Sequence, residues 1–224
     1  MCKFLCFLLL PFSAHAFNID SMVKYYNKDN FFILTGDKKE TREYIYTTIT
    51  ELTVSNGKDV ERELLSSDVA RWPIIAEPSE ILLNDGEQVK VKIEKNHVDS
   101  NEDRIFGITF TPDLISNKGD KNYNIGFGYK VWMIVPGKQK IQGDMSVMRG
   151  ASLGDFIISN KTNKVVEVDV NYCKDASATK SCRGQLVIRP RADKKISLGI
   201  RAGKAEFSFY IGGDKTNPLK IVKL

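Results

Sequence analysis

The feature that most limits the possible folds of this chain is an alternation of apolar and polar residues with a period of two. Val89, Val91 and Ile93 alternate with lysines, and residues 166–172 alternate in the same way. This period places the apolar side chains on one face of an extended strand, whereas a helix needs a period of about 3.6. The chain is therefore predicted to consist of half-buried β-strands.

Shorter apolar runs predict further strands at 31–34, 44–50, 81–83, 105–110, 156–158, 186–188, 207–211 and 219–222. Turn sequences such as Asn84-Asp-Gly86 and Gly212-Gly-Asp214 separate them. The only helical candidate is short, within residues 59–69, and a loop there is an open alternative. Many short strands with polar turns predict an all-β protein made of two immunoglobulin-like β-sandwich domains.

The first residues, MCKFLCFLLLPFSAHA, have the order of a secretory signal peptide. Lys3 is followed by an apolar stretch and by Ala14-His15-Ala16, a small-x-small cleavage site. Residues 1–16 are predicted to be removed on export. No cysteine directly follows the predicted cut, so no lipoprotein is expected, and no later segment is apolar enough for membrane insertion.

The remaining chain, 224 residues less 16, suits two domains of ~100 residues each. A Pro136-Gly137 break predicts the boundary, with an N-terminal domain at 17–137 and a C-terminal domain at 138–224. Cys173 and Cys182 are the cysteines left after maturation, and in an exported protein they are predicted to form a disulfide. A loop this short contributes a little under ~3 kcal/mol in the entropy model.

Composition and motifs argue against several classes of function. The net charge of +5, lowered by one when Lys3 is removed, comes from scattered lysines, so nucleic-acid binding is not expected. The chain has no G-x-S-x-G, no H-E-x-x-H and no phosphate-binding glycine loop, and His97 stands alone in a polar stretch. We therefore expect no enzyme, no metal site and no cofactor.

Residues 123–136 read YNIGFGYKVWMIVP, and Lys130 is the only charge in this stretch. Large apolar residues stand at every second position from 123 to 131, with asparagine or glycine between the first four. One hypothesis is a core strand of an ordinary sandwich, with Lys130 reaching a rim. The other is an edge strand that offers its apolar row to a guest by β-augmentation.

The order of segments resembles the PapD-like periplasmic chaperones of the chaperone–usher pilus pathway. The segment from Trp72 to Gly86 leads into the strand at 87–93, and Glu102-Asp-Arg-Ile-Phe-Gly-Ile-Thr-Phe110 is similar to the family's Arg-containing strand. YNIGFGYKVWMIVP then stands where the family has its last N-domain strand. Residues 154–160 and 207–224 are similar to segments of its second domain, so the resemblance covers the mature chain.

The resemblance implies an L-shaped arrangement of the two domains with an interdomain cleft, and a place in the periplasm. Such a chaperone binds pilin or fimbrial subunits that lack a strand, stabilises them by donor-strand complementation and delivers them to an outer-membrane usher. A dimer in which the free chaperone caps its own strand is an open possibility. The alternative function is a secreted immunoglobulin-like adhesin or pilus subunit.

The resemblance also assigns roles to residues. The apolar donor-strand side chains are Tyr123, Ile125, Phe127 and Tyr129. The subunit's C-terminal carboxylate would be bound by Lys130 and by Lys24, eighth from the predicted new N-terminus. Arginine is common at the position of Lys24, and Lys28 is a second candidate. Where many members carry an interdomain arginine this chain has Val135, so packing is expected to orient the domains.

Overall fold

The computed structural model describes residues 17–37, 42–55, 58–96, 99–113, 127–173, 182–198 and 204–224. The signal peptide, His97, Tyr123 and Ile125 lie outside these residues. The described residues form seventeen β-strands and one short 3-10 helix, so the predicted all-β fold is confirmed.

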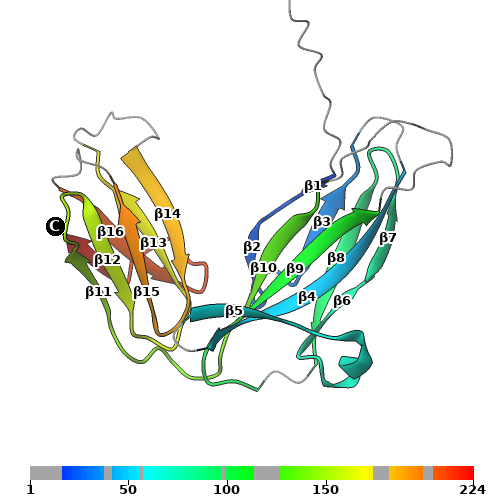
Figure 1. The fold of residues 1–224 in the computed structure, drawn as a ribbon, viewed down its shortest axis with the longest axis horizontal. Helices are drawn as coiled ribbons and strands as arrows, with labels where there is room; N and C mark the ends of the chain where they lie inside the picture. The colour runs from blue at the N-terminus through cyan, green and yellow to red at the C-terminus, as the bar shows by residue number, and fades with distance from the viewer. Residues whose placement is uncertain are drawn as a thin grey trace, which may run out of the picture.

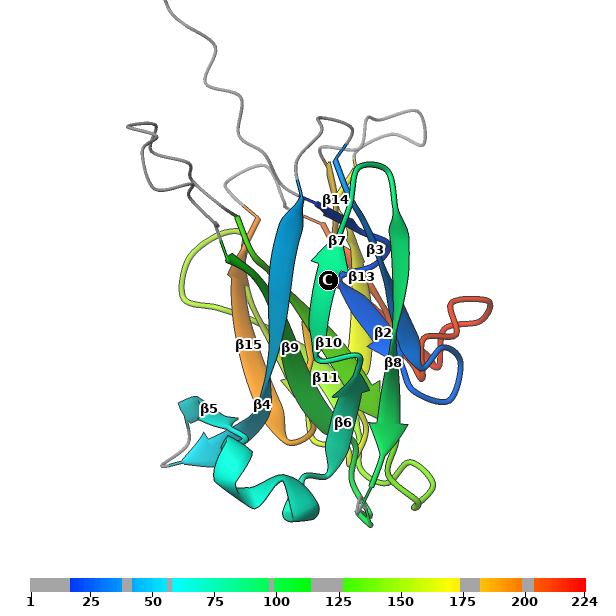
Figure 2. The same ribbon diagram turned by 90° about the vertical axis from the view of Figure 1, so that its right-hand side faces the viewer.

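The strands up to residue 135 form the first lobe, a sandwich of two sheets (Figures 1 and 2). One sheet has the order β1 (Asn18–Ile19), β3 (Phe31–Thr35), β8 (Gln88–Lys95), β6 (Ile74–Glu77). The other has the order β2 (Val23–Tyr25), β10 (Tyr129–Val135), β9 (Arg104–Asp113), β4 (Glu43–Ser55), β5 (Lys58–Glu63), and β7 (Glu80–Leu83) pairs with β4.

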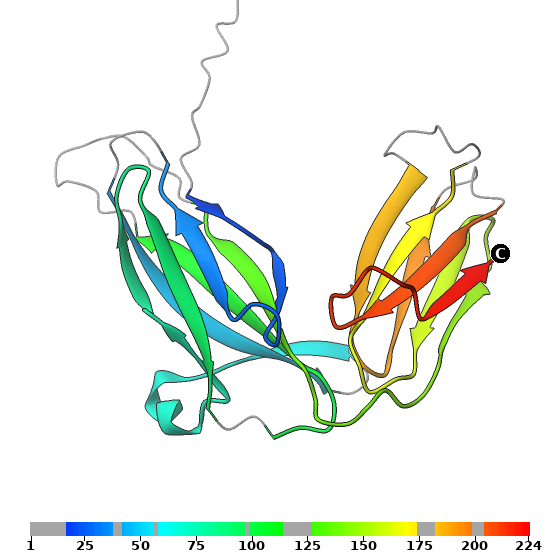
Figure 3. The same ribbon diagram turned by 180° about the vertical axis from the view of Figure 1, so that it is seen from behind.

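The strands from residue 145 onward form the second lobe, again with two sheets. They have the orders β11 (Met145–Arg149), β12 (Asp155–Asn160), β15 (Ala192–Ser197) and β14 (Arg183–Ile188), β13 (Val166–Asn171), β16 (Glu206–Ile211), β17 (Lys220–Lys223). Figure 3 shows the two lobes joined at one end and diverging toward the other, with β5 near the junction in Figure 1.

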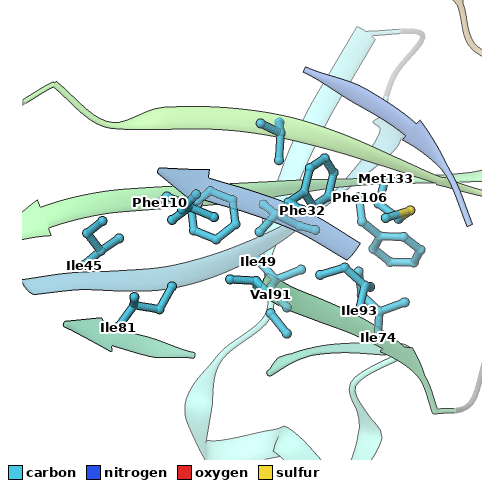
Figure 4. Packing of buried hydrophobic residues seen from close by; sticks show 14 of the residues in the cluster. Phe32, Ile45, Ile49, Ile74, Ile81, Val91, Ile93, Phe106, Phe110 and Met133 are labelled. Carbon is cyan, nitrogen blue, oxygen red and sulfur yellow. The ribbon is translucent and has the colours of Figure 1, made fainter. Parts of the chain in front are cut away.

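Each lobe has its own core. In the first lobe, Phe32, Phe106, Phe110 and Met133 are fully buried between the two sheets (Figure 4). The core of the second lobe includes Phe156, whose ring meets that of Phe207 edge-on. Burial of one large apolar side chain contributes about 1.5–3 kcal/mol. The apolar residues that alternate along the strands are the ones buried here, so they account for the stability of both cores.

A domain boundary between residues 137 and 138 remains our proposal.

The structure differs from the sequence-based expectation in the strands that lack apolar alternation. β5 reads KDVERE and forms by pairing with β4, from Thr50 opposite Glu63 to Ser55 opposite Lys58. Residues 59–63 of the helical candidate at 59–69 are thus strand, and its residues 66–69 belong to the short 3-10 helix η1 (Ser66–Arg71). β10 begins only at Tyr129, and residues 127–128 before it are not in a strand.

The disulfide predicted between Cys173 and Cys182 is present, with the two Cα atoms 5.0 Å apart, inside the usual range for such bridges. Within the described ranges, no helix is both long and apolar enough to cross a membrane.

Candidate functional site

The edge of β10 is open along part of its length. On one side β10 pairs with β9 over all seven residues, from Tyr129 opposite Phe110 to Val135 opposite Arg104. On the other side, β2 covers only residues 132–134, where the Trp132 amide donates to the Met22 carbonyl at 2.9 Å. Across the described ranges, no strand covers residues 129–131 on that side. Proteins normally protect such an edge, so an open one is a candidate site for an added strand.

Tyr129 is the donor-strand candidate that lies within β10, on the inner face of the strand, which looks into the sandwich together with Val131 and Met133. Val131 and Met133 are buried in the core. Tyr129 is half-buried, and its ring meets the Phe17 ring edge-on with centroids 5.1 Å apart. Phe127 is 50% exposed, just before the strand begins. Tyr129 therefore supports the lobe's own core, whereas Phe127 is accessible; Tyr123 and Ile125 lie outside the described residues.

Lys130 lies on the opposite, outer face of β10, together with Trp132 and Ile134. Its ammonium donates to the Glu61 carboxylate on β5 and lies 5.3 Å from the centroid of the Trp132 ring. Partial burial lowers the pKa of Lys130, because desolvation disfavours the charged form. The cation is thus held at the side of the sheet that faces the second lobe.

Lys24 lies on the inner face of the same sheet. It pairs in parallel register with Met133, and paired residues of parallel strands point to the same side. Its ammonium donates to Asp20 at 2.6 Å, to Asp29 at 2.8 Å and to the Phe31 carbonyl at 2.7 Å. Lys24 is only 8% exposed. It is already neutralised by two carboxylates, as a buried ammonium requires.

The structure therefore places Lys24 and Lys130 on neighbouring strands but does not bring their side chains to one site. Lys28, the second candidate, is exposed in the turn that follows β2.

Apolar packing and one buried carboxylate join the lobes. Tyr25, Ile105 and Ile134 of the first lobe pack around Val165 of the second. Asp103, whose side chain is 4% exposed, accepts bonds from the Gly137 and Val165 amides at 2.8 and 2.9 Å and from the Lys164 ammonium at 3.1 Å.

Apolar packing around Val165 and the polar contacts of Asp103 thus both join the lobes. That packing orients them, as the valine at position 135 led us to expect, stays a prediction. No local pattern in the sequence marks Asp103 as a contact residue, because its partners lie 34 to 62 residues further along the chain.

A cavity of about 310 Å³ lies between the lobes, beside the outer face of β10. Its lining includes Val23, Leu52, Ile105, Trp132, Val187 and Arg189. Arg189 of the second lobe forms an ion pair with Asp59 of β5. The space is apolar on the β10 side, and the ion pair between Asp59 and Arg189 also lines it.

The described ranges contain no group of three or more histidine, cysteine or acidic residues placed to hold a metal ion. His97 lies outside them.

The fold is that of the pilus-assembly chaperones. The structure of the class 5 fimbriae chaperone CfaA has a TM-score of 0.58 at 13% identity and aligns over 93% of this chain and 97% of its own. A chain of the Salmonella enterica complex between the SafA pilin and the SafB chaperone has a TM-score of 0.59 at 7% identity, over 95% and 97%. The resemblance to PapD-like chaperones is thereby confirmed at the level of the fold.

The sequence comparison is more specific. The family model of the CS5 fimbrial protein N-terminal domain matches residues 19–136. An Escherichia coli protein described as an uncharacterized 25.9 kDa protein in the CS5 3′ region is 44% identical over 212 residues, which are 93% of this chain and 94% of the relative. The chain belongs to the CS5 fimbrial protein family.

Proposed function

We propose that this protein is a periplasmic chaperone of fimbrial assembly, not an enzyme. It binds fimbrial subunits by donor-strand complementation and delivers them to an outer-membrane usher. The family match and the chaperone fold over nearly the whole chain support this role, and they favour it over the alternative of an adhesin or pilus subunit.

The open edge of β10 carries the proposal. A subunit strand added beside residues 129–131 would form backbone hydrogen bonds with groups that have no strand partner on that side within the described part of the chain. The exposed Phe127 precedes this edge, and Tyr123 and Ile125 continue the alternation in the sequence. Each large apolar side chain placed in a subunit's groove would contribute about 1.5–3 kcal/mol.

Lys130 is the cation that we propose for the subunit's C-terminal carboxylate. It stands at the base of the open edge, and its side chain is 33% exposed. The proposed role of Lys24 is harder to reconcile with the geometry, because Lys24 would have to give up Asp20 and Asp29 and turn to the other face of the sheet. We therefore place the anchor at Lys130 and keep Lys24 as the weaker candidate.

The test is co-expression of the full chain with the fimbrial subunits encoded beside it, followed by affinity capture from the periplasm. We expect Lys130→Ala to remain folded but to capture at most about a tenth of the subunit, as loss of a charged hydrogen-bonding partner predicts.

Lys92→Ala is the matched control, since Lys92 is also an ion-paired strand lysine but lies in the other sheet of the lobe. Normal capture of the subunit by Lys130→Ala would exclude the carboxylate anchor at this position. Capture of no subunit by the unaltered protein would exclude the chaperone function.

A further inference from the structure

The outer face of β5 is acidic and adjoins the proposed anchor. Asp59, Glu61 and Glu63 alternate along the strand, and the first two bind cations beside the space between the lobes. Glu61 binds Lys130 of β10, and Asp59 binds Arg189 of the second lobe. One short strand therefore supplies carboxylates to two cations from other parts of the fold.

The contact between Glu61 and Lys130 is formed across the two strands, β9 and β4, that lie between β5 and β10 in the sheet. A Cβ atom on Gly107 would lie 2.6 Å from Cε of Lys130, so the lysine lies directly over this glycine of β9. The Thr50 hydroxyl of β4 donates to the same Glu61 carboxylate at 3.1 Å. Because Gly107 has no side chain, the Lys130 side chain can reach Glu61, and the hydrogen bond from Thr50 holds the Glu61 carboxylate in place. These contacts distinguish the pair from a chance meeting of two mobile surface side chains.

This arrangement has a consequence for any guest carboxylate. An ammonium ion that already binds Glu61 attracts a second carboxylate less strongly, and the two carboxylates repel each other. A guest that binds Lys130 must therefore displace Glu61 or lie beside it at an electrostatic cost. Because the two side chains are 33% and 39% exposed, water screens this cost and it remains moderate.

We propose that Glu61 is an affinity- and specificity-determining residue, an internal carboxylate that competes with the subunit's terminal carboxylate for Lys130. This inference rests on the proposed function of Lys130. The competition weakens the complex and eases transfer of the subunit. It also means that the subunit must contribute enough strand and apolar contacts to displace the internal partner.

The experiment compares full-length mature protein with Glu61→Gln and with Glu63→Gln. Glutamine at 61 keeps an acceptor oxygen for Thr50 and Lys130 but removes the charge. Glu63→Gln is the matched control, because it makes the same charge change two residues along the same face of β5. The probe is a twelve-residue peptide of alternating valine and threonine with two N-terminal lysines, made with either a free C-terminal carboxylate or a C-terminal amide. Binding is measured by isothermal titration calorimetry.

We expect Glu61→Gln to bind the carboxylate peptide about three- to tenfold more tightly than the unaltered protein, with little change for the amide peptide. Glu63→Gln should stay close to the unaltered protein for both. Equal or weaker binding of the carboxylate peptide by Glu61→Gln, an equal gain with Glu63→Gln, or no binding of either peptide would overturn the role of Glu61. None of these results would affect the chaperone function, which depends on capture of whole subunits.

Discussion

The two faces of the β2–β10 strand pair have opposite characters, although both carry a lysine. On the inner face, Lys24 is enclosed by Asp20 and Asp29 and lies beside the core residue Met133. On the outer face, Lys130 and Trp132 face the second lobe, and Lys130 is partly accessible. Lys24 thus forms a structural ion pair on one face, whereas Lys130 is a candidate binding group on the other.

The two lysines differ in their partners, and we infer their different roles from these partners. The ammonium of Lys24 has three acceptors within 2.8 Å, from Asp20 before β2, Asp29 after it and the first residue of β3, Phe31. A group satisfied in this way stabilises the fold. Lys130 has one carboxylate partner, Glu61 of β5. Both side chains are partly exposed, so replacement of Glu61 by another carboxylate would not disturb the core.

Replacement of Lys24 should have the largest effect. Lys24→Met leaves two neighbouring carboxylates without their cation, and removal of one partner of a buried ion pair costs about 3–5 kcal/mol. Urea unfolding followed by fluorescence measures the loss. Lys28→Met, in the exposed turn nearby, should change stability by less than about 0.5 kcal/mol. A stable Lys24→Met protein that no longer captures subunits would reverse the comparison and make Lys24 the anchor.

The second-largest effect is expected from replacement of Asp103, which lies at the contact between the two lobes. Asp103→Ala removes the acceptor of two amides and the partner of Lys164, so we expect a loss of about 2–3 kcal/mol and a wider spread of lobe orientations. Urea unfolding and small-angle X-ray scattering measure the two changes. Asp99→Ala, at an exposed ion pair with Lys138, is the control. Unchanged scattering and stability would show that the packing around Val165 alone orients the lobes.

The smallest effect is a pH dependence at Tyr25, which follows Lys24 in β2 but faces the second lobe. Burial, and then the charge of Glu167, raise the pKa of Tyr25 above its usual value of 10. The unfolded tyrosine loses its proton near pH 10 while the folded one keeps it, so the unfolded state binds fewer protons and stability falls as pH rises above 10.

Between pH 9 and 11 the unaltered protein should therefore lose about 1 kcal/mol more stability than Tyr25→Phe. Unfolding in urea at several pH values tests this, with Tyr210→Phe, at a half-buried tyrosine, as the control. Identical pH profiles for the unaltered protein and Tyr25→Phe would place the Tyr25 hydroxyl in water.

Local patterns predicted much of the fold. β8 and β13 were found from their alternation, and the cysteine pair from its spacing in an exported chain. β5 and β15 were missed because KDVERE and ADKKIS lack a regular apolar alternation, and each pairs with a neighbouring strand, β5 with β4 and β15 with β12. Lys130 was found as the lone charge in an apolar strand. Asp20 lies four residues before Lys24, and this short spacing was a local indication of the ion pair between the two residues.

The sequence by itself determined that this chain forms half-buried strands and two cores, with Lys130 as the only charge in strand β10, because alternation and turn residues act over a few positions. Tertiary structure decided which face each lysine occupies and which carboxylate it meets. The pairing of Lys24 with Met133 and of Lys130 with Glu61 joins residues 109 and 69 positions apart. Contacts over such separations depend on sheet order and register, which no short stretch of the chain contains.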